Sequence, residues 1–179
     1  MEKVIIFGTG NIGLTILQLS KLAGAMNIYA VDILDYRLKI AEKMGAAAII
    51  NSKHEDPVEK IIQLTNGRGV DVGFEAAGAP ETPQQTINSI KQGGTFVFVG
   101  IIPTSIIQWD TETTRRKEVT IKMIHRSRHA YDRAIDLVKK EKIDIKPFIT
   151  HRFPLEKVEE AFQTVINYKD NVLKAIIKP

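Results

Sequence analysis

The stretch Val4-Ile5-Ile6-Phe7-Gly8-Thr9-Gly10-Asn11-Ile12-Gly13 decides the fold. Its first four residues form a continuous apolar run, which is typical of a strand buried on both faces. The glycines that follow match the pattern G-x-G-x-x-G, and the apolar spacing beyond them predicts a helix over Asn11–Ala23. Between a strand and a helix, this pattern is typical of a loop that holds the pyrophosphate of a dinucleotide.

The residue types in this loop suit that task for physical reasons. Gly8 permits a tight turn, Gly10 lets the backbone approach a pyrophosphate, and Gly13 lets the helix pack close to the strand. The free N–H groups and the positive partial charge at the start of the helix attract the anion. We therefore expect the cofactor to contact Gly8, Gly10, Asn11, Ile12 and Gly13. A strand–helix turn that is rich in glycine by chance is the alternative.

Asp32 is the second feature that points to a dinucleotide. It lies 24 residues after Gly8 and directly follows a predicted strand at Ile28–Val31. An acid at this point can accept hydrogen bonds from both hydroxyls of the adenosine ribose, and it repels a 2′-phosphate, so it favours NAD over NADP. Arg37, one helical turn further on, either contacts the ribose or lies in solvent. The alternative role of Asp32 is to cap the helix that follows.

The alternation of apolar runs and helix-like segments continues along the chain. Further strands are expected at Ala48–Ile50, Val70–Phe74, Thr95–Val99 and Thr120–Ile124, and helices at Leu34–Met44, at Pro57–Thr65 with Asp56 as N-cap, and at Pro80–Ile90. This rhythm predicts an α/β fold, a doubly wound, parallel, six-stranded Rossmann sheet with helices on both faces. An isolated strand is expected at Ile106–Trp109.

The last third of the chain predicts a small α/β lobe. It is expected to contain a helix at Tyr131–Lys140, a strand at Phe148–Phe153, a helix at Leu155–Asn167 and a strand at Leu173–Ile177. We therefore divide the chain into a dinucleotide-binding domain at residues 1–125 and a C-terminal lobe at residues 126–179.

Small residues follow two of the central strands. Ala76 and Ala77 come after the fourth strand, and Gly100 comes after the fifth, between Val99 and Ile101. Ligands of open α/β sheets bind outside the carboxyl ends of the strands, so we expect these five residues to line the cofactor crevice. Plain packing in tight turns explains small residues equally well.

Composition excludes several other classes of protein. The chain has 179 residues, a net charge of +4 and no cysteine, which removes thiolate zinc sites, iron–sulfur clusters and cysteine nucleophiles. The absence of cysteine fits a reducing compartment, and we expect a cytoplasmic location. The apolar runs are too short to span a bilayer, and the longest basic run, Arg115-Arg116-Lys117, is more typical of a solvated turn than of a nucleic-acid surface. We expect neither a membrane nor a nucleic-acid partner.

Several longer stretches resemble the cofactor domain of the medium-chain, zinc-type alcohol dehydrogenases. The similarity covers the Gly8–Gly13 loop, Ala41–Ala46, Gly69–Gly78, Gly93–Gly100 and the tail from Ile149 onward. Among these enzymes the polyol (sorbitol-type) dehydrogenases are the most similar. They tend to carry Lys-Glu-Val, a strand and then an arginine, as Lys117-Glu118-Val119 and Arg126 do here, although His125 and Ser127 replace the aromatic residues beside that arginine.

The resemblance implies NAD as the cofactor and hydride transfer between an alcohol and NAD. It implies that Val99 and residues near Ile124 hold the nicotinamide, that Arg126 reaches the cofactor and active-site region, and that Lys174 meets the pyrophosphate. It also implies a homodimer, in which two sheets join edge to edge through Ile106–Trp109.

Members of this family are about twice as long as this chain, and their N-terminal half carries the zinc ligands and the proton relay. With no cysteine and four histidines, this chain is expected to hold no metal site and no catalytic residue. We expect it to bind NAD(H) without oxidising alcohols alone, and zinc to belong to a separate catalytic domain that is its partner. The C-terminal lobe packs on that domain in the family, so Phe148, Phe153 or Phe162 should border an exposed apolar patch.

Two other functions fit parts of the sequence. A standalone NAD(H)-binding regulatory module also uses the glycine loop and a downstream acid, but the long tail that matches the dehydrogenases argues against it. A methyltransferase-like nucleotide binder usually places an acid ahead of its first glycine, and Phe7 stands there instead.

Overall fold

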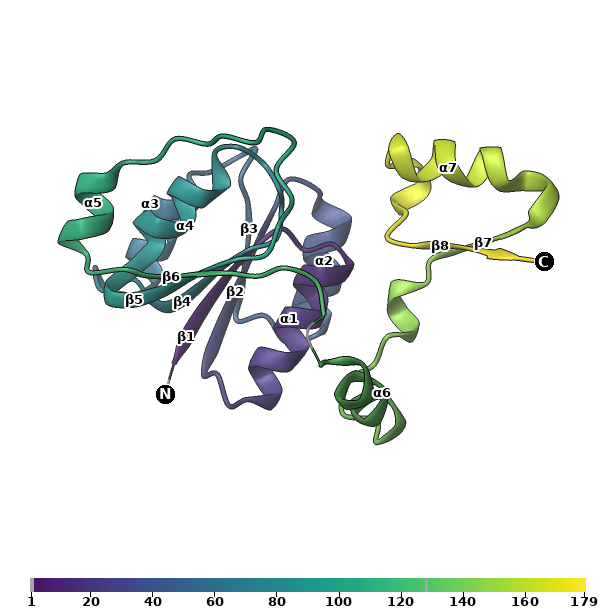
Figure 1. Ribbon diagram of the computed structural model, residues 1–179, viewed down its shortest axis with the longest axis horizontal. Coiled ribbons are helices and arrows are strands. Elements are labelled where there is room, and N and C mark those ends of the chain that lie inside the picture. Colours follow the sequence, from purple (N-terminus) through teal and green to yellow (C-terminus); the bar gives the residue numbers. More distant parts are fainter. Residues whose placement is uncertain (1, 128) are drawn as a thin grey trace. The chain divides into compact units, whose positions relative to one another are not determined.

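A computed structural model of the chain describes residues 2–127 and 129–179. The chain divides into two compact units, residues 1–128 and residues 129–179. In Figure 1 the first unit runs from purple to green and the second from green to yellow.

The first unit is built on one parallel sheet. Its strands are β1 (Lys3–Phe7), β2 (Asn27–Asp32), β3 (Ala48–Asn51), β4 (Val70–Glu75), β5 (Ile90–Phe98) and β6 (Thr120–Met123). They lie in the order β3-β2-β1-β4-β5-β6, and every neighbouring pair is parallel. This is the strand order of the Rossmann fold, so the predicted six-stranded, doubly wound sheet is confirmed.

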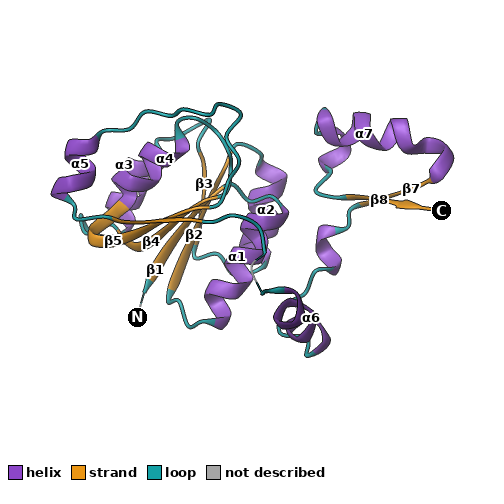
Figure 2. Ribbon diagram, viewed as in Figure 1, coloured by secondary structure: helices purple, strands orange, loops and turns teal. Residues whose placement is uncertain are grey.

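Helices cover both faces of this sheet (Figure 2). They are α1 (Asn11–Leu22), α2 (Asp35–Lys43), α3 (Pro57–Leu64), α4 (Thr82–Ser89) and α5 (Thr111–Arg116). Successive residues of a strand point to opposite faces, so Ile5 and Phe7 of β1 join the core beneath α3 and α4, while Ile6 faces α1. Burial on both faces explains why β1 is apolar at every position after Lys3.

Several details of the first unit differ from the sequence predictions. The predicted strand at Ile106–Trp109 is wrong, because none of the described strands pairs with this segment and an extended chain needs a ladder partner to form a strand. Its Trp109 instead packs edge-on against Phe96, with 6.5 Å between ring centroids. Helix α4 begins at Thr82 rather than at Pro80. Strand β5 begins at Ile90 rather than at Thr95, and its pairing with β4 shifts register after Ile90. The expected N-cap of α3 is confirmed, because Asp56 accepts from the N–H groups of Val58 and Glu59.

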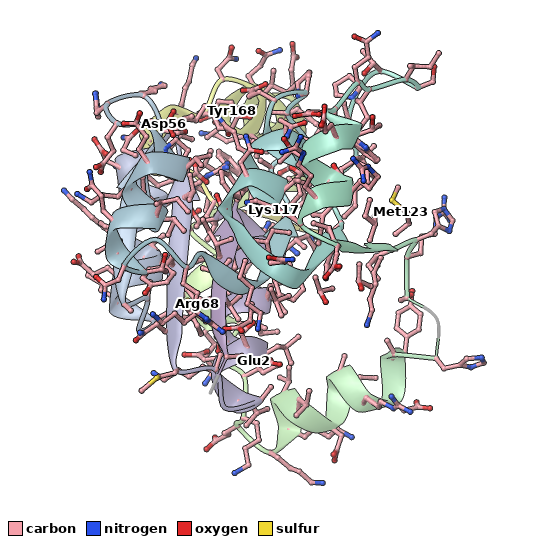
Figure 3. All side chains as sticks on the ribbon, turned by 90° about the vertical axis from the view of Figure 1, so that its left-hand side faces the viewer. Glu2, Asp56, Arg68, Lys117, Met123 and Tyr168 are labelled. Atoms are coloured by element: carbon pink, nitrogen blue, oxygen red, sulfur yellow. The ribbon has the colours of Figure 1, made fainter. Side chains whose placement is uncertain are left out.

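Lys117 departs from the solvated turn that the basic run predicts. Its ammonium group donates to three carbonyls, those of Ile87 (3.2 Å), Asn88 (2.5 Å) and Ile90 (2.8 Å). These carbonyls lie at the end of α4 and the start of β5. Figure 3 labels the Lys117 side chain that reaches them. Burial lowers the pKa of Lys117, but a cation at carbonyls that the helix leaves unpaired is stabilising. The side chain thus ties the end of α4 to the strand that follows.

The second unit is a small α/β lobe, as the sequence predicts. It contains α6 (Tyr131–Lys139), α7 (Val158–Ile166), three short 3₁₀ turns, and strands β7 (His151–Pro154) and β8 (Ala175–Lys178), which pair in parallel. The predicted strand at Phe148–Phe153 begins only at His151, because Lys146–Phe148 forms a 3₁₀ turn that includes Pro147. Proline suits the first turn of a helix and removes a donor from a strand.

Helix α7 keeps an apolar stripe in solvent. The stripe consists of Val158, Phe162, Val165 and Ile166, and the two largest exposures are 64% for Phe162 and 65% for Ile166. Phe162 therefore has the exposure expected from the sequence, whereas Phe148 is buried and Phe153 is half-buried. A contiguous apolar stripe of this kind is typical of an interaction surface.

A charged cluster around Asp71 joins three segments of the first unit. The carboxylate accepts from the Lys3 N–H (2.8 Å) and forms ion pairs with Arg68 (2.7 Å) and Lys91 (2.7 Å). Burial alone would raise the pKa of Asp71, but the hydrogen bonds from Arg68, from the Lys3 N–H and from Lys91, together with the charge of Arg68, hold it well below its ordinary value.

We expect Asp71→Asn to lower the free energy of unfolding by about 2 kcal/mol at pH 7, because it weakens several charge-assisted hydrogen bonds. Above about pH 5 the carboxyl is ionised in both the folded and the unfolded chain, and its stabilisation is complete. As pH falls further, only the unfolded chain takes up the proton, so the free energy of unfolding of the wild type decreases. The difference in this free energy between the wild type and Asp71→Asn therefore becomes smaller. Urea titrations between pH 3 and pH 7 measure the free energy of unfolding of both proteins.

The control is Glu112→Gln. Glu112 forms an exposed ion pair with Arg116, so this variant should change the free energy of unfolding little. Equal acid sensitivity in wild type and Asp71→Asn would contradict the account.

Candidate cofactor site

The glycine loop joins β1 to α1 in a turn that requires glycine at its first and last positions. Gly8 has a φ of +89°, and a Cβ on it would lie 2.6 Å from the backbone nitrogen of Ala77. A Cβ on Gly13 would collide with the carbonyl oxygen of Gly8. The packing roles expected of these two glycines therefore agree with the geometry.

Gly10 differs from its two neighbours. A Cβ there would meet only Arg37 Nη1, at 3.8 Å, so the packing of the fold does not require glycine at this position. The absence of a side chain leaves open space beside the backbone at the start of α1. A bound pyrophosphate needs open space of this kind, and the contact expected for Gly10 stays a prediction.

Helix α1 begins without a cap. No side chain caps it at Gly10, and its first turn holds no acidic residue. Helix α4 shares both properties, whereas Asp56 caps α3 and Asp110 caps α5. The first N–H groups of a helix have no partner within the helix and carry its positive partial charge. An anion is therefore favoured at this end of α1. Ile12, in the same turn, is an exposed apolar side chain.

Asp32 ends β2 beside this loop, as predicted, and its carboxylate accepts four hydrogen bonds. Oδ2 accepts from the N–H (2.7 Å) and the hydroxyl (2.9 Å) of Thr9, and Oδ1 accepts from the N–H groups of Ile33 (2.8 Å) and Leu34 (3.1 Å). The N-cap residue of α2 is Leu34, so the alternative role of Asp32 as N-cap is wrong. The carboxylate instead connects the end of β2 to the glycine loop.

Arg37 lies near this carboxylate. Its Nη1 is 4.0 Å from Asp32 Oδ2, and only 19% of its side chain is exposed. The guanidinium lies 5.8 Å from the ring centroid of Tyr36, and its Nε donates to the Tyr36 hydroxyl. Arg37 is therefore held beside the predicted ribose site rather than free in solvent.

Glu75, which the sequence interpretation did not select, organises the turns after β4 and β5. It is completely buried, and its Oε1 accepts from Ala77 N–H (2.9 Å), Gly78 N–H (2.7 Å) and the Thr82 hydroxyl (2.8 Å). Its carbonyl accepts from the N–H groups of Val99 and Gly100, both at 2.9 Å. One residue thus holds both turns that were expected to line the crevice. An acid at the carboxyl end of a central strand was the signal that could have revealed it.

The turns at the carboxyl ends of β1, β4 and β5 contact each other through their backbones. A Cβ on Gly78 would lie 2.6 Å from the Ile101 carbonyl oxygen, and one on Gly100 would collide with the Glu75 carboxylate. These contacts bring the predicted residues Gly8, Ala76, Ala77, Gly100 and Ile101 to one edge of the sheet, where Ile101 is 92% exposed.

The remaining predicted residues lie elsewhere in the chain. Arg126 follows β6 in the first unit and is exposed, with a φ of +55°. Lys174 belongs to the second unit, where its carbonyl accepts from Thr150 and His151 N–H groups. The cofactor contacts implied for these two residues stay predictions.

Three further properties concern the described residues. Within residues 2–127 and 129–179, no three or more histidine, aspartate and glutamate side chains gather closely enough to hold a metal ion. None of the helices in this part of the chain combines the length and apolar character needed to cross a bilayer. A cavity of about 360 Å³ lies among Glu2, Ser20, Ala25 and Val72, at the opposite end of α1 from the glycine loop.

Comparison with known proteins places these features in a family. Residues 11–140 match the family model described as zinc-binding dehydrogenase. The chain is 35% identical to an uncharacterised zinc-type alcohol dehydrogenase-like protein of Escherichia coli, YdjJ, over 99% of this chain and 50% of that protein. It is 32% identical to a sorbitol dehydrogenase of Bacillus subtilis, over 98% of this chain and 50% of the enzyme.

A solved structure shares the fold over the same extent. It is a zinc-binding dehydrogenase homologue from Sinorhizobium meliloti bound to NADP, with 29% identity and a TM-score of 0.90, over 99% of this chain and 52% of that one. The chain therefore spans about half the length of the relatives it matches.

Proposed function

The chain belongs to the zinc-binding dehydrogenase family, and from that premise we propose that it is the NAD(H)-binding part of a zinc-type alcohol or polyol dehydrogenase. The observation that carries the proposal is the pairing of an uncapped, glycine-lined start of α1 with the carboxylate of Asp32 at the end of the neighbouring strand. When bound, the nicotinamide ring supplies the hydride acceptor or donor for alcohol chemistry.

Each part of the site has a distinct task in this proposal. The N–H groups at the start of α1, beside Gly10, bind the pyrophosphate. Asp32 accepts from the adenosine ribose, with Arg37 alongside. The turns that Glu75 holds, at Ala76–Gly78 and Val99–Ile101, border the nicotinamide half of the crevice and fix its width.

We expect the protein to prefer NADH to NADPH by at least tenfold in Kd. The buried carboxylate of Asp32 would face the 2′-phosphate of NADPH, and like charges at short distance cost at least ~1.4 kcal/mol. Fluorescence titration with both cofactors measures the ratio, and Asp32→Asn should reduce it towards one. A similar protein has been solved with NADP bound. Equal affinity for both cofactors in the wild type would contradict the preference for NAD.

We also expect the chain alone not to oxidise alcohols. Zinc in such enzymes polarises the alcohol oxygen, and the described residues offer no cluster that would hold it. We infer that a separate zinc-bearing domain supplies this chemistry, and the exposed α7 stripe fits a surface that such a domain covers. Spectrophotometric assays of NADH formation with several alcohols and polyols test this. Turnover by metal-free protein would contradict it.

A homodimer is part of the same proposal. The segment Ile106–Trp109 pairs with none of the described strands, and Ile106 is exposed. In a dimer this segment would gain the ladder partner that it lacks in the single chain.

A further inference from the structure

We infer that the hydroxyl of Thr9 competes with the adenosine ribose for Asp32 and thereby limits how tightly the site holds NAD(H). The inference rests on the proposed function, because it takes the ribose of NAD(H) to bind at this carboxylate. It concerns a residue between the first two glycines, where the pattern G-x-G-x-x-G leaves the residue type open.

The acceptor capacity of Asp32 is already taken up in this structure. An ionised carboxylate has about four lone-pair positions, and four donors from Thr9, Ile33 and Leu34 occupy them at 2.7–3.1 Å. The ribose brings two further hydroxyl donors. For both to bind, at least one of the present donors has to leave or share its position.

The Thr9 hydroxyl is the donor that can leave. The other three are backbone N–H groups, and their positions are set by the glycine turn and by the chain that leads from β2 into α2. Withdrawing the hydroxyl needs only a rotation of one side chain, which is a far smaller rearrangement than moving backbone.

The hydrogen bond between the Thr9 hydroxyl and the Asp32 carboxylate is buried. Thr9 is 1% exposed and Asp32 is 7% exposed, although Asp32 ends a strand at the ligand-binding edge of the sheet. Binding of the ribose therefore breaks a charge-assisted hydrogen bond that the free protein has already formed. That loss weakens the affinity for every ligand that carries the adenosine ribose, and for no other ligand.

The test compares Thr9→Ala with Thr9→Ser. Both variants lose the threonine methyl group and keep the backbone N–H bond to Asp32, but only serine keeps the hydroxyl. Calorimetric titrations would use NADH, ADP-ribose, and reduced nicotinamide mononucleotide, which lacks the adenosine ribose. We expect Thr9→Ala to bind NADH and ADP-ribose at least threefold more tightly than the wild type. The affinity of Thr9→Ser for these two ligands should stay within twofold of the wild type. The affinity for the mononucleotide should be the same in all three proteins.

Several results would overturn the inference. One is NADH binding to Thr9→Ala that is unchanged or weaker, and another is an equal gain in affinity for the mononucleotide. A wild type that binds no NADH would instead overturn the proposed function itself, and the inference with it.

A measurement on the wild type alone keeps the test independent of the folding of any variant. Because Thr9 holds the acceptor position, removing one ribose hydroxyl should cost the wild type little, and 2′-deoxy-NADH should bind within threefold of NADH. A loss of more than tenfold would show that the ribose already has full use of Asp32 and would overturn the inference.

Discussion

Gly13→Ala is expected to destabilise the first unit by about 3 kcal/mol or more, whereas Gly10→Ala, at the N-cap of α1, is expected to cost about 1 kcal/mol or less. The new Cβ at residue 13 collides with the backbone carbonyl of Gly8, which can move only by opening the β1–α1 turn. At residue 10 the new Cβ meets nothing closer than Arg37 Nη1 at 3.8 Å, and the φ of −70° suits alanine.

The same two variants should distinguish an effect on stability from an effect on NADH affinity. Gly10→Ala places a methyl group in the open space proposed for the pyrophosphate, so it should weaken NADH binding at least tenfold, or ~1.4 kcal/mol, in a fully folded protein. Thermal unfolding and NADH titration of both variants measure the two effects. Normal NADH affinity in Gly10→Ala would contradict the proposed position of the pyrophosphate, and a stable Gly13→Ala would contradict the packing account.

Glu75→Ala is the second change with a large expected effect. It leaves two backbone N–H groups and the Thr82 hydroxyl without the oxygen that accepts all three, inside a fully buried site. We expect the free energy of unfolding to fall by about 3 kcal/mol or more. Since Glu75 holds the turn after β4, the NADH affinity of the remaining folded protein should fall as well.

Glu75→Gln is the matched control for this change. Glutamine has nearly the same shape and keeps one oxygen that can accept from the three donors, so it should lose less than half as much stability as alanine. Urea titrations of the wild type and the two variants give the comparison. If glutamine were as damaging as alanine, the acceptor role of Oε1 would not be the reason that Glu75 is buried here.

The order and type of most elements could be predicted from the sequence because one physical pattern dominates them. The strands β1 to β5 carry apolar residues, and glycine, proline or aspartate marks the bounds of several helices, as Asp56 and Pro57 do for α3. The position of Asp32 beside the glycine loop follows directly from this alternation. Ile106–Trp109 carries the same kind of apolar signal, but a strand also needs a neighbour, and sequence alone does not show whether one is present.

Several of the features that sequence did not predict depend on contacts between residues far apart along the chain. Lys117 is one of three consecutive basic residues, and only the fold brings the carbonyls of α4 within its reach. The role of Glu75 likewise depends on backbone turns that exist only once β4 and β5 are paired. The hydrogen bonds of Thr9 to Asp32 connect residues 23 positions apart.

The central claim is that this chain binds NAD(H) at the loop between β1 and α1. Calorimetric titration of the whole chain with NADH tests it most directly. The account predicts saturable binding of one NADH per chain, with a Kd in the micromolar-to-millimolar range that weakens at least tenfold in Gly10→Ala. No detectable binding of NADH to the folded wild-type protein would contradict it.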